Sequence, residues 1–205
     1  MLVATINYWG AGGILVPMDV THTSLPGVLV LTPTPYRDDR GFFSRTFDAE
    51  VVASAGIDPH GFVQDSVSRS RQGVVRGLHV RTGAGEAKLV RCSRGAIFDV
   101  VVDLRPGSPT YLTWLSFDLD DETPRSVYIP AGCAHGFQAL TEPADITYRI
   151  DREHDPSEDL TISFRDPRLD IPWPLPVTLA SAKDLDAPLL EQLEGRLATI
   201  APAPR

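Results

Sequence analysis

The chain has 205 residues, of which 42% are hydrophobic, which is enough to close one sizeable core, and no break in composition divides it. Its formal net charge of -8 argues against a nucleic-acid or membrane-surface partner, because proteins that bind phosphate polymers usually carry net basic charge. Two cysteines, Cys92 and Cys133, supply no disulfide framework, and the first residues contain neither a basic leader nor an apolar run of membrane-spanning length. We therefore expect a cytoplasmic protein with one folded domain.

Strands are predicted along most of the chain, because short segments rich in β-branched and aromatic residues alternate with Gly, Pro and Asp. In chain order these segments lie at 27–33, 41–47, 62–70, 73–81, 88–105, 110–119, 126–130, 135–140, 145–150 and 160–164. The long segment 88–105 divides into two strands at Ser93-Arg94-Gly95. In its second strand alternate apolar residues share one face, and Asp99 and Asp103 are expected on the other, outward face. So many short strands predict an all-β sandwich or barrel.

Two helices are predicted from their end signals. The first spans 48–56, with Asp48 as its N-cap and Gly56 at its end. The second begins at Ser181, where Ser181 and Asp184 resemble a capping box, and runs through "APLLEQLEGRLATI".

One short motif raises the possibility of a metal site. Pro130, Gly132 and His135 in "IPAGCAHGF" resemble the second motif of the cupin superfamily, whose jelly-roll barrel holds its site in the barrel mouth. Metal-binding cupins add a His-x-His pair and a Glu, because a transition metal needs three or four converging N or O ligands. Here the pair reads His79-Val80-Arg81, and an arginine cannot ligate. Although Glu86 could supply a carboxylate, we expect no metal.

Longer blocks carry a more specific resemblance. "DDRGFFSRTF", "FVQDSVSRSRQGVVRGLHV", "KLVRCSRGAIFDVVVDLRPGSPTYLTW", "YIPAGCAHGF" and "FRDPRLDIPWPLP" occur in the order that is typical of the RmlC family. These are the dTDP-4-dehydrorhamnose 3,5-epimerases and their relatives in deoxysugar pathways. The resemblance begins near Thr23, so we divide the chain into an N-terminal extension of unknown role, residues 1–22, and a single RmlC-like domain, residues 23–205.

The resemblance implies a fold and an activity. The fold is all-β, a cupin-type jelly-roll barrel or sandwich with a few short helices, including one at the C-terminus. The activity is that of an isomerase without a cofactor: a homodimer that epimerises a dTDP-linked 4-keto-6-deoxyhexose in rhamnose or antibiotic-sugar biosynthesis.

That chemistry needs a base of near-neutral pKa, a cation or donor at the enolate oxygen, and an acid on the opposite face of the sugar. The resemblance makes His79 the base, Asp166 the carboxylate that orients it, Lys88 the cation and Tyr148 the acid. A histidine, with an ordinary pKa of about 6.5, suits the first role. A simpler interpretation stays open for each residue. His79 could be a core histidine whose hydrogen bonds are satisfied, and Asp166 could form a turn before a proline. Lys88 could be a solvated strand residue, and Tyr148 could pack in the barrel interior.

Further residues match family positions around the substrate. Arg76 matches a diphosphate contact, and Arg40 matches another that reaches the site from the neighbouring subunit. A planar guanidinium suits this task, although a surface salt bridge is the alternative for each arginine. Phe43 and Gln64 correspond to positions around the thymine and sugar, and His135 to the barrel mouth and sugar.

Four residues depart from the family pattern near the expected pocket: Arg45 replaces Glu, Ser66 replaces Asn, Arg81 replaces Gln and His154 replaces Tyr. We count Arg81 and His154 among the candidate substrate contacts. These changes leave open the sugar and whether C3, C5 or both are epimerised. Two other functions also stay open, a metal-dependent cupin isomerase or oxygenase and a catalytically silent sugar-nucleotide-binding protein.

Overall fold

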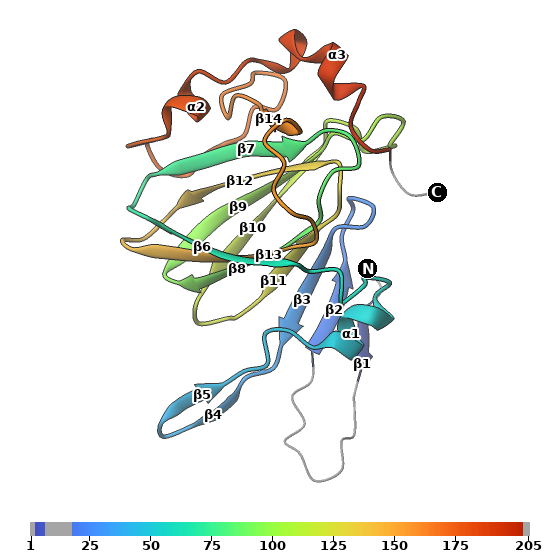
Figure 1. Ribbon diagram of the computed structural model, residues 1–205. Helices are drawn as coiled ribbons and strands as arrows, with labels where there is room; N and C mark the ends of the chain where they lie inside the picture. The colour runs from blue at the N-terminus through green and yellow to red at the C-terminus, as the bar shows by residue number, and fades with distance from the viewer. Residues whose placement is uncertain (1–2, 7–17, 203–205) are drawn as a thin grey trace.

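Two antiparallel sheets face each other in the computed structural model, which describes residues 3–6 and 18–202 (Figure 1). The larger sheet has seven strands, in the order β1 (Val3–Ile6), β2 (Met18–His22), β3 (Leu29–Pro33), β11 (Ser126–Ile129), β8 (Lys88–Arg94), β13 (Ala144–Ile150) and β6 (Gln64–Ser70). The smaller sheet has five, in the order β10 (Trp114–Asp120), β9 (Ala96–Asp103), β12 (Cys133–Ala139), β7 (Val75–Arg81) and β14 (Asp159–Thr161). This arrangement confirms the predicted all-β sandwich or barrel.

The main core lies between the sheets. It is built from alternate residues of each strand, including Val90, Val127 and Ile146 from the larger sheet and Val101 and Phe137 from the smaller one. Strand alternation places these side chains on the inner faces of the two sheets.

Strand β9 is buried on both faces, which corrects one prediction. Its second face, with Val100 and Val102, packs under the C-terminal segment. Asp99 and Asp103, which were expected to point outward, are both 0% exposed. The prediction failed because alternation separates two faces but does not say which of them is covered.

Helix α1 (Ala49–Ser54) forms where the sequence predicts it. The Asp48 carboxylate accepts the backbone N–H groups of Glu50 and Val51, which satisfies donors that the first turn leaves free. Val51 and Val52 are buried in a second core with residues of β2 and β3, outside the larger sheet.

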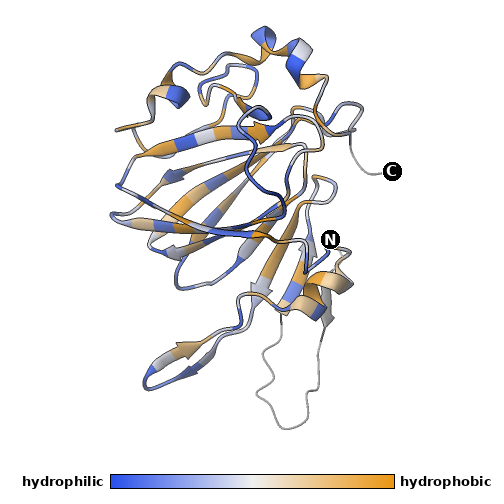
Figure 2. Ribbon diagram, viewed as in Figure 1, coloured by the Kyte–Doolittle hydropathy of each residue, from blue (hydrophilic) through white to orange (hydrophobic). Residues whose placement is uncertain are grey.

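The predicted C-terminal helix is wrong as one element. The chain instead forms α2 (Ala182–Leu185), a 3₁₀ turn (Leu190–Gln192) and α3 (Glu194–Leu197). Pro188 lacks a backbone N–H and interrupts helical hydrogen bonding. The pieces cover the outer face of the smaller sheet, where their apolar residues are buried (Figure 2). No helix in the described part of the chain is long and apolar enough to cross a membrane.

The N-terminal part of the chain adds two strands to the larger sheet and also forms a separate hairpin. Strands β1 and β2 fall within the predicted extension, and β2 pairs with β3, while residues 7–17 lie outside the described ranges. Strands β4 (Tyr36–Asp38) and β5 (Gly41–Phe43) form a hairpin that stands away from the sheets (Figure 1). The predicted strand 41–47 therefore ends at Phe43.

Candidate active site

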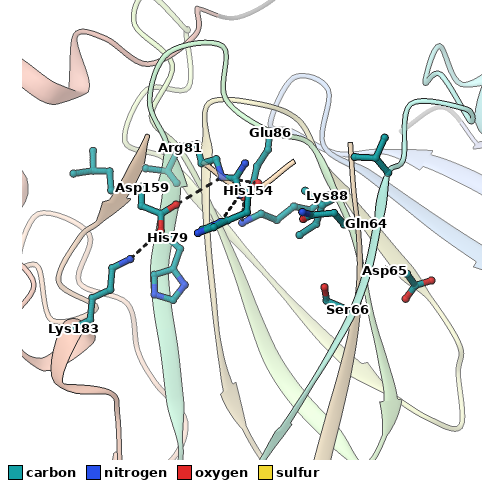
Figure 3. A pocket seen from close by; sticks show the side chains of 14 residues that line it. Gln64, Asp65, Ser66, His79, Arg81, Glu86, Lys88, His154, Asp159 and Lys183 are labelled. Carbon is teal, nitrogen blue, oxygen red and sulfur yellow. Dashed lines mark hydrogen bonds and ion pairs between the residues drawn. The ribbon is translucent and has the colours of Figure 1, made fainter. Parts of the chain in front are cut away.

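A cavity of about 700 Å³ lies between the two sheets and gathers many of the predicted site residues (Figure 3). It is lined by residues of β6, β7, β8 and the segment before β14, among them Gln64, His79, Arg81, Lys88 and His154. Five candidates that are far apart in the sequence therefore share one space.

The departures from the family pattern divide between this cavity and the surface. Ser66, Arg81 and His154 line the cavity. Arg45 instead forms an ion pair with Asp48, at 2.6 Å, beside the start of α1. Three of the four departures thus bear on the shape and polarity of the cavity.

His79 on β7 is oriented by a buried carboxylate. Its Nε2 lies 2.7 Å from Oδ1 of Asp184, and the Asp184 side chain is only 3% exposed whereas that of His79 is 42% exposed. Burial raises the pKa of Asp184, but His79, the Ser181 hydroxyl and the Gly77 N–H together outweigh this and hold the pKa below its ordinary value. The ionised carboxylate accepts the Nε2 proton and leaves the Nδ1 lone pair of neutral His79 free to take another.

Asp184 is the residue that sequence reasoning missed in this role. The sequence predicted Ser181 as a helix start, and the Ser181 hydroxyl does accept the Asp184 backbone N–H. The Asp184 carboxylate also reaches His79, and no local signal in the sequence indicates this contact.

The prediction that Asp166 orients His79 is wrong. Asp166 is buried, and its two carboxylate oxygens accept the backbone N–H groups of Arg168 and Leu190. Both bonds fix the chain where it crosses the outer face of the smaller sheet. Asp166 is therefore a structural residue that holds the turn before the C-terminal segment.

Lys88 enters the cavity from β8, in the sheet opposite His79. Its Nζ forms an ion pair with Oε1 of Glu86 at 2.9 Å, and the Lys88 side chain is 13% exposed. The carboxylate holds the ammonium group at the cavity wall. Glu86, weighed in the sequence only as a metal ligand, is here the partner of a lysine.

Tyr148 lies on β13, also in the larger sheet, next to a second histidine–carboxylate pair. Its hydroxyl is 3.2 Å from Ser68 Oγ, and its ring meets the His135 ring edge-to-face at 6.2 Å between centroids. His135 Nε2 in turn lies 2.6 Å from Asp99 Oδ1. Burial raises the pKa of Tyr148, so the phenol keeps its proton at neutral pH.

His135 is 5% exposed and is not among the residues that line the cavity. It contacts the Tyr148 ring, and Tyr148 is likewise not among the residues that line the cavity.

Arg76 reaches the same side of β7 as His79 through an irregularity in the strand. The pairing of β7 with β12 shifts register between His135, which faces His79, and Phe137, which faces Arg76. The backbones come very close there: a Cβ on Gly77, at φ +133°, would lie 2.5 Å from Gly136 Cα. Only glycine fits such a contact and such a φ.

A second cavity, of about 350 Å³, adjoins the first at His79. Arg76, Ser181 and Asp184 also line it. The two predicted cation and base positions, Arg76 and His79, therefore lie on one continuous surface.

Arg40 and Phe43 lie outside both cavities, on the β4–β5 hairpin. The Arg40 side chain is 88% exposed and its guanidinium pairs with Asp38. Phe43 is 57% exposed, and Tyr36 and Phe42 on the same hairpin are also exposed.

The described residues contain no group of three or more His, Cys, Asp or Glu side chains arranged to hold a metal ion. Both candidate histidines present Nε2 to a single carboxylate, His79 to Asp184 and His135 to Asp99.

Comparison with known proteins gives matches to one enzyme family. A family model described as dTDP-4-dehydrorhamnose 3,5-epimerase matches residues 22–192. The chain is 41% identical to the dTDP-4-dehydrorhamnose 3,5-epimerase of Pseudomonas aeruginosa over 175 residues, which cover 85% of this chain and 92% of the relative. It is 42% identical to the dTDP-4-dehydrorhamnose 3-epimerase of Streptomyces niveus, covering 85% of both chains.

A solved structure resembles the whole fold. The RmlC of Legionella pneumophila in complex with dTDP-4-keto-L-rhamnose superimposes with a TM-score of 0.84 at 37% identity, covering 92% of this chain and all of the other. The match confirms the expected fold class. Sequence and structure together place the chain in the dTDP-4-dehydrorhamnose 3,5-epimerase family.

Proposed function

We propose that the chain epimerises a dTDP-linked 4-keto-6-deoxyhexose in deoxysugar biosynthesis, by removing a proton next to the ketone and returning one to the opposite face. The observation that carries this proposal is the partly exposed His79 hydrogen-bonded to the buried, ionised Asp184 in a cavity that also holds Lys88.

The first step is proton abstraction by His79. Nδ1 takes the proton of the sugar C–H bond, and the electron pair of that bond moves into the enolate. The ring becomes an imidazolium whose Nε2–H still points at the Asp184 carboxylate, 2.7 Å away. Because Asp184 is buried and ionised, it stabilises this charge and fixes the ring's orientation.

The enolate oxygen gains negative charge in this step, and Lys88 is the cation that faces it. Glu86 holds the Lys88 ammonium group at the cavity wall, so the cation is already in position before the enolate forms.

Reprotonation from the opposite face completes the inversion. His79 belongs to the five-stranded sheet and Tyr148 to the seven-stranded sheet that faces it. Tyr148 shares a face of β13 with Ile150, which lines the cavity, so we infer that a sugar held between the sheets has the base on one side and the protonated phenol on the other. We assign the acid role to Tyr148, with Ser68 orienting its hydroxyl at 3.2 Å.

We assign binding of the nucleotide part of the substrate to Arg76 and to the β4–β5 hairpin, which carries Arg40 and Phe43. Arg76 supplies a cation for the diphosphate. The exposed aromatic hairpin suits a homodimer in which Arg40 and Phe43 reach the site of the second subunit, while Gln64 contacts the nucleotide or sugar from within.

A mixing experiment tests the assembly. Arg40→Ala and His79→Asn proteins, each impaired alone at low substrate concentration, should regain activity when their subunits are exchanged, because each mixed dimer contains one intact site. No recovery in demonstrably mixed dimers would place Arg40 in its own subunit's site.

We also place the protein in the cytoplasm. Its two cysteines are buried and unpaired, as suits a reducing compartment. Fractionation of the producing cell with a cytoplasmic marker enzyme checks this location.

Solvent exchange tests the reaction itself. With dTDP-4-keto-6-deoxyglucose in deuterated water, the protein should place deuterium at C3, C5 or both, and His79→Asn should abolish this while still binding dTDP. Tight dTDP binding without exchange would instead make the protein a silent binder, and activity that needs a stoichiometric metal would make it a metal-dependent cupin.

A further inference from the structure

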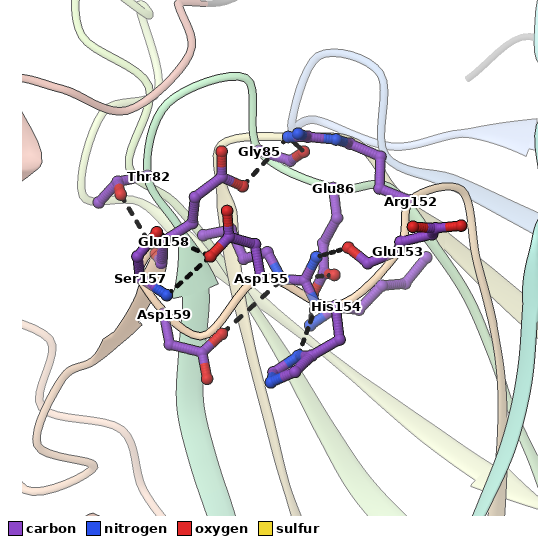
Figure 4. Close-up of polar contacts among 12 residues, drawn as sticks. Thr82, Gly85, Glu86, Arg152, Glu153, His154, Asp155, Ser157, Glu158 and Asp159 are labelled. Carbon is purple, nitrogen blue, oxygen red and sulfur yellow. Dashed lines mark hydrogen bonds and ion pairs between the residues drawn. The ribbon is translucent and has the colours of Figure 1, made fainter.

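Arg81, a departure from the family pattern, lies among protein partners at the end of β7. Its side chain is 5% exposed, and its Nε lies 2.8 Å from Glu86 Oε2. One terminal nitrogen donates to the Glu153 carbonyl at 2.7 Å, and the other lies 2.9 Å from His154 Nδ1. Glu153 and His154 belong to the segment between β13 and β14 (Figure 4). These contacts hold the Arg81 guanidinium in the cavity wall.

Glu86 joins Arg81 to Lys88, the cation assigned to the enolate oxygen. The Glu86 side chain is 7% exposed, and its other oxygen, Oε1, lies 2.9 Å from Lys88 Nζ. Figure 3 shows Glu86 between the two cations. Oε2 has no hydrogen-bond partner among the described residues, so its contact with Arg81 is an ion pair without hydrogen-bond alignment. What Arg81 supplies to Glu86 is therefore chiefly charge.

Asp159 and Lys183 add one further ion pair beside this group. Asp159 Oδ1 lies 3.7 Å from Arg81 Nε, and Asp159 Oδ2 lies 3.4 Å from Lys183 Nζ. The formal charges of Asp159 and Lys183 cancel. The group formed by Lys88, Glu86 and Arg81 carries two cations against one anion.

Asp151 shows that neighbouring groups respond to the charge of Glu86. Asp151 Oδ1 accepts the backbone N–H of Ala87 at 2.7 Å. Burial raises the pKa of Asp151, the charge of Glu86 raises it further, and Arg152 lowers it in part. A change in the charge balance at Glu86 therefore acts on the groups around it.

Proton abstraction places a negative charge on the sugar oxygen that Lys88 faces. The Glu86 carboxylate beside the Lys88 ammonium offsets part of its attraction for that charge. Arg81 compensates Glu86 from its other oxygen, so the three side chains together keep one net positive charge when the enolate forms. Without Arg81, Lys88 and Glu86 would form a neutral pair.

We propose that Arg81 is a positioning residue for proton abstraction: it acts through Glu86, whose charge it balances, so that Lys88 meets the enolate oxygen as an uncompensated cation. The inference rests on the proposed function for the reaction itself. It requires no contact between Arg81 and the substrate. It also gives one departure from the family pattern a role, because an arginine supplies a charge where the usual Gln supplies only a dipole.

The rate of solvent deuterium incorporation at saturating dTDP-4-keto-6-deoxyglucose tests this charge balance. Arg81→Gln removes the cation and should slow exchange about 10- to 100-fold, while dTDP affinity stays within about threefold of wild type. Glu86→Gln breaks the same ion pair but changes the charge in the opposite direction, so its rate should exceed that of Arg81→Gln at least about tenfold. The double variant again carries one net positive charge and should recover to within about threefold of wild type.

Arg152→Gln is the matched control, because it removes an arginine from the neighbouring segment without touching Glu86. The Arg152 side chain is 38% exposed and pairs with Glu158 at 3.2 Å. Its charge is screened by solvent, so this variant should exchange within about threefold of the wild-type rate. A thermal melt of each variant confirms that all rates are measured on folded protein.

Three results would overturn the inference. Equal slowing by Arg81→Gln and Glu86→Gln would make the ion pair a structural contact only, and a double variant as slow as Arg81→Gln would exclude charge balance. A loss of dTDP affinity in Arg81→Gln that Glu86→Gln does not repair would make Arg81 a phosphate contact. Each of these leaves wild-type exchange intact, whereas failure of the proposed function would appear as no exchange by the wild-type protein.

Discussion

Replacing Asp184 with Asn should slow proton abstraction with little change in fold. The Asp184 side chain is 3% exposed and lies 2.7 Å from Nε2 of His79, so the substitution removes a short, charge-assisted hydrogen bond. Such a bond is worth about 1.5–3 kcal/mol, or roughly 10- to 100-fold in rate. An asparagine amide can also donate to the ring and select the wrong tautomer, with Nδ1 protonated, which raises the expected loss to about 100- to 1,000-fold.

Asp166→Asn is the matched control, because it makes the same chemical change at another buried carboxylate. Asp166 accepts two backbone N–H groups, and asparagine can satisfy only one of them. The expected cost is about 1–3 kcal/mol of unfolding free energy, with exchange close to the wild-type rate. The assay is loss of the sugar proton signals in deuterated water by NMR, with urea unfolding of each variant.

An exchange of roles between the two variants would refute Asp184 as the carboxylate that orients His79. A folded Asp166→Asn protein without exchange, next to an Asp184→Asn protein at wild-type rate, would mean that Asp166 orients His79 during catalysis.

Three further substitutions test the packing and the acid. Burial raises the pKa of Asp103, but hydrogen bonds from Arg105 and neighbouring hydroxyls outweigh burial and lower the pKa from 3.8 to about 2. Ionised Asp103 therefore adds about 2 kcal/mol to the free energy of unfolding. This stabilisation is present above pH 3.8 and is lost as the pH falls through 2. Asp103→Asn should therefore unfold at lower urea than wild type at neutral pH, with a gap that closes in acid; a pH-independent gap would contradict the assignment. Gly77→Ala should destabilise the protein by about 2 kcal/mol or more, because its Cβ would lie 2.5 Å from Gly136 Cα, and an unchanged melting temperature would show that the strands yield there. Tyr148→Phe should retain exchange but lose inversion, and full conversion to the epimer by this variant would remove Tyr148 as the acid.

Most strands could be predicted because each depends on local sequence. Strand β9, for example, lies between turn residues, and the alternation of its side chains is visible in the sequence. Helix α1 was predictable for the same reason, since Asp48 supplies its cap three residues before Val51. These signals act over a few residues and do not depend on what packs against them.

The errors arise where distant segments decide the outcome. Asp99 is buried because β12 supplies His135 against it, and nothing in the strand's own pattern reveals that partner. Asp184 and Asp166 are both carboxylates near the C-terminus, and only the path of the chain back across β7 decides which meets His79. The signal that was present, the cap at Ser181, located Asp184 without showing where its side chain points.

The most direct test of the central claim is the rate at which wild-type protein and His79→Asn wash solvent deuterium into C3 and C5 of dTDP-4-keto-6-deoxyglucose. We expect incorporation at one or both carbons by wild type, and none above background by His79→Asn protein that still binds dTDP with unchanged affinity. Incorporation by His79→Asn at the wild-type rate would contradict the assignment of His79 as the base.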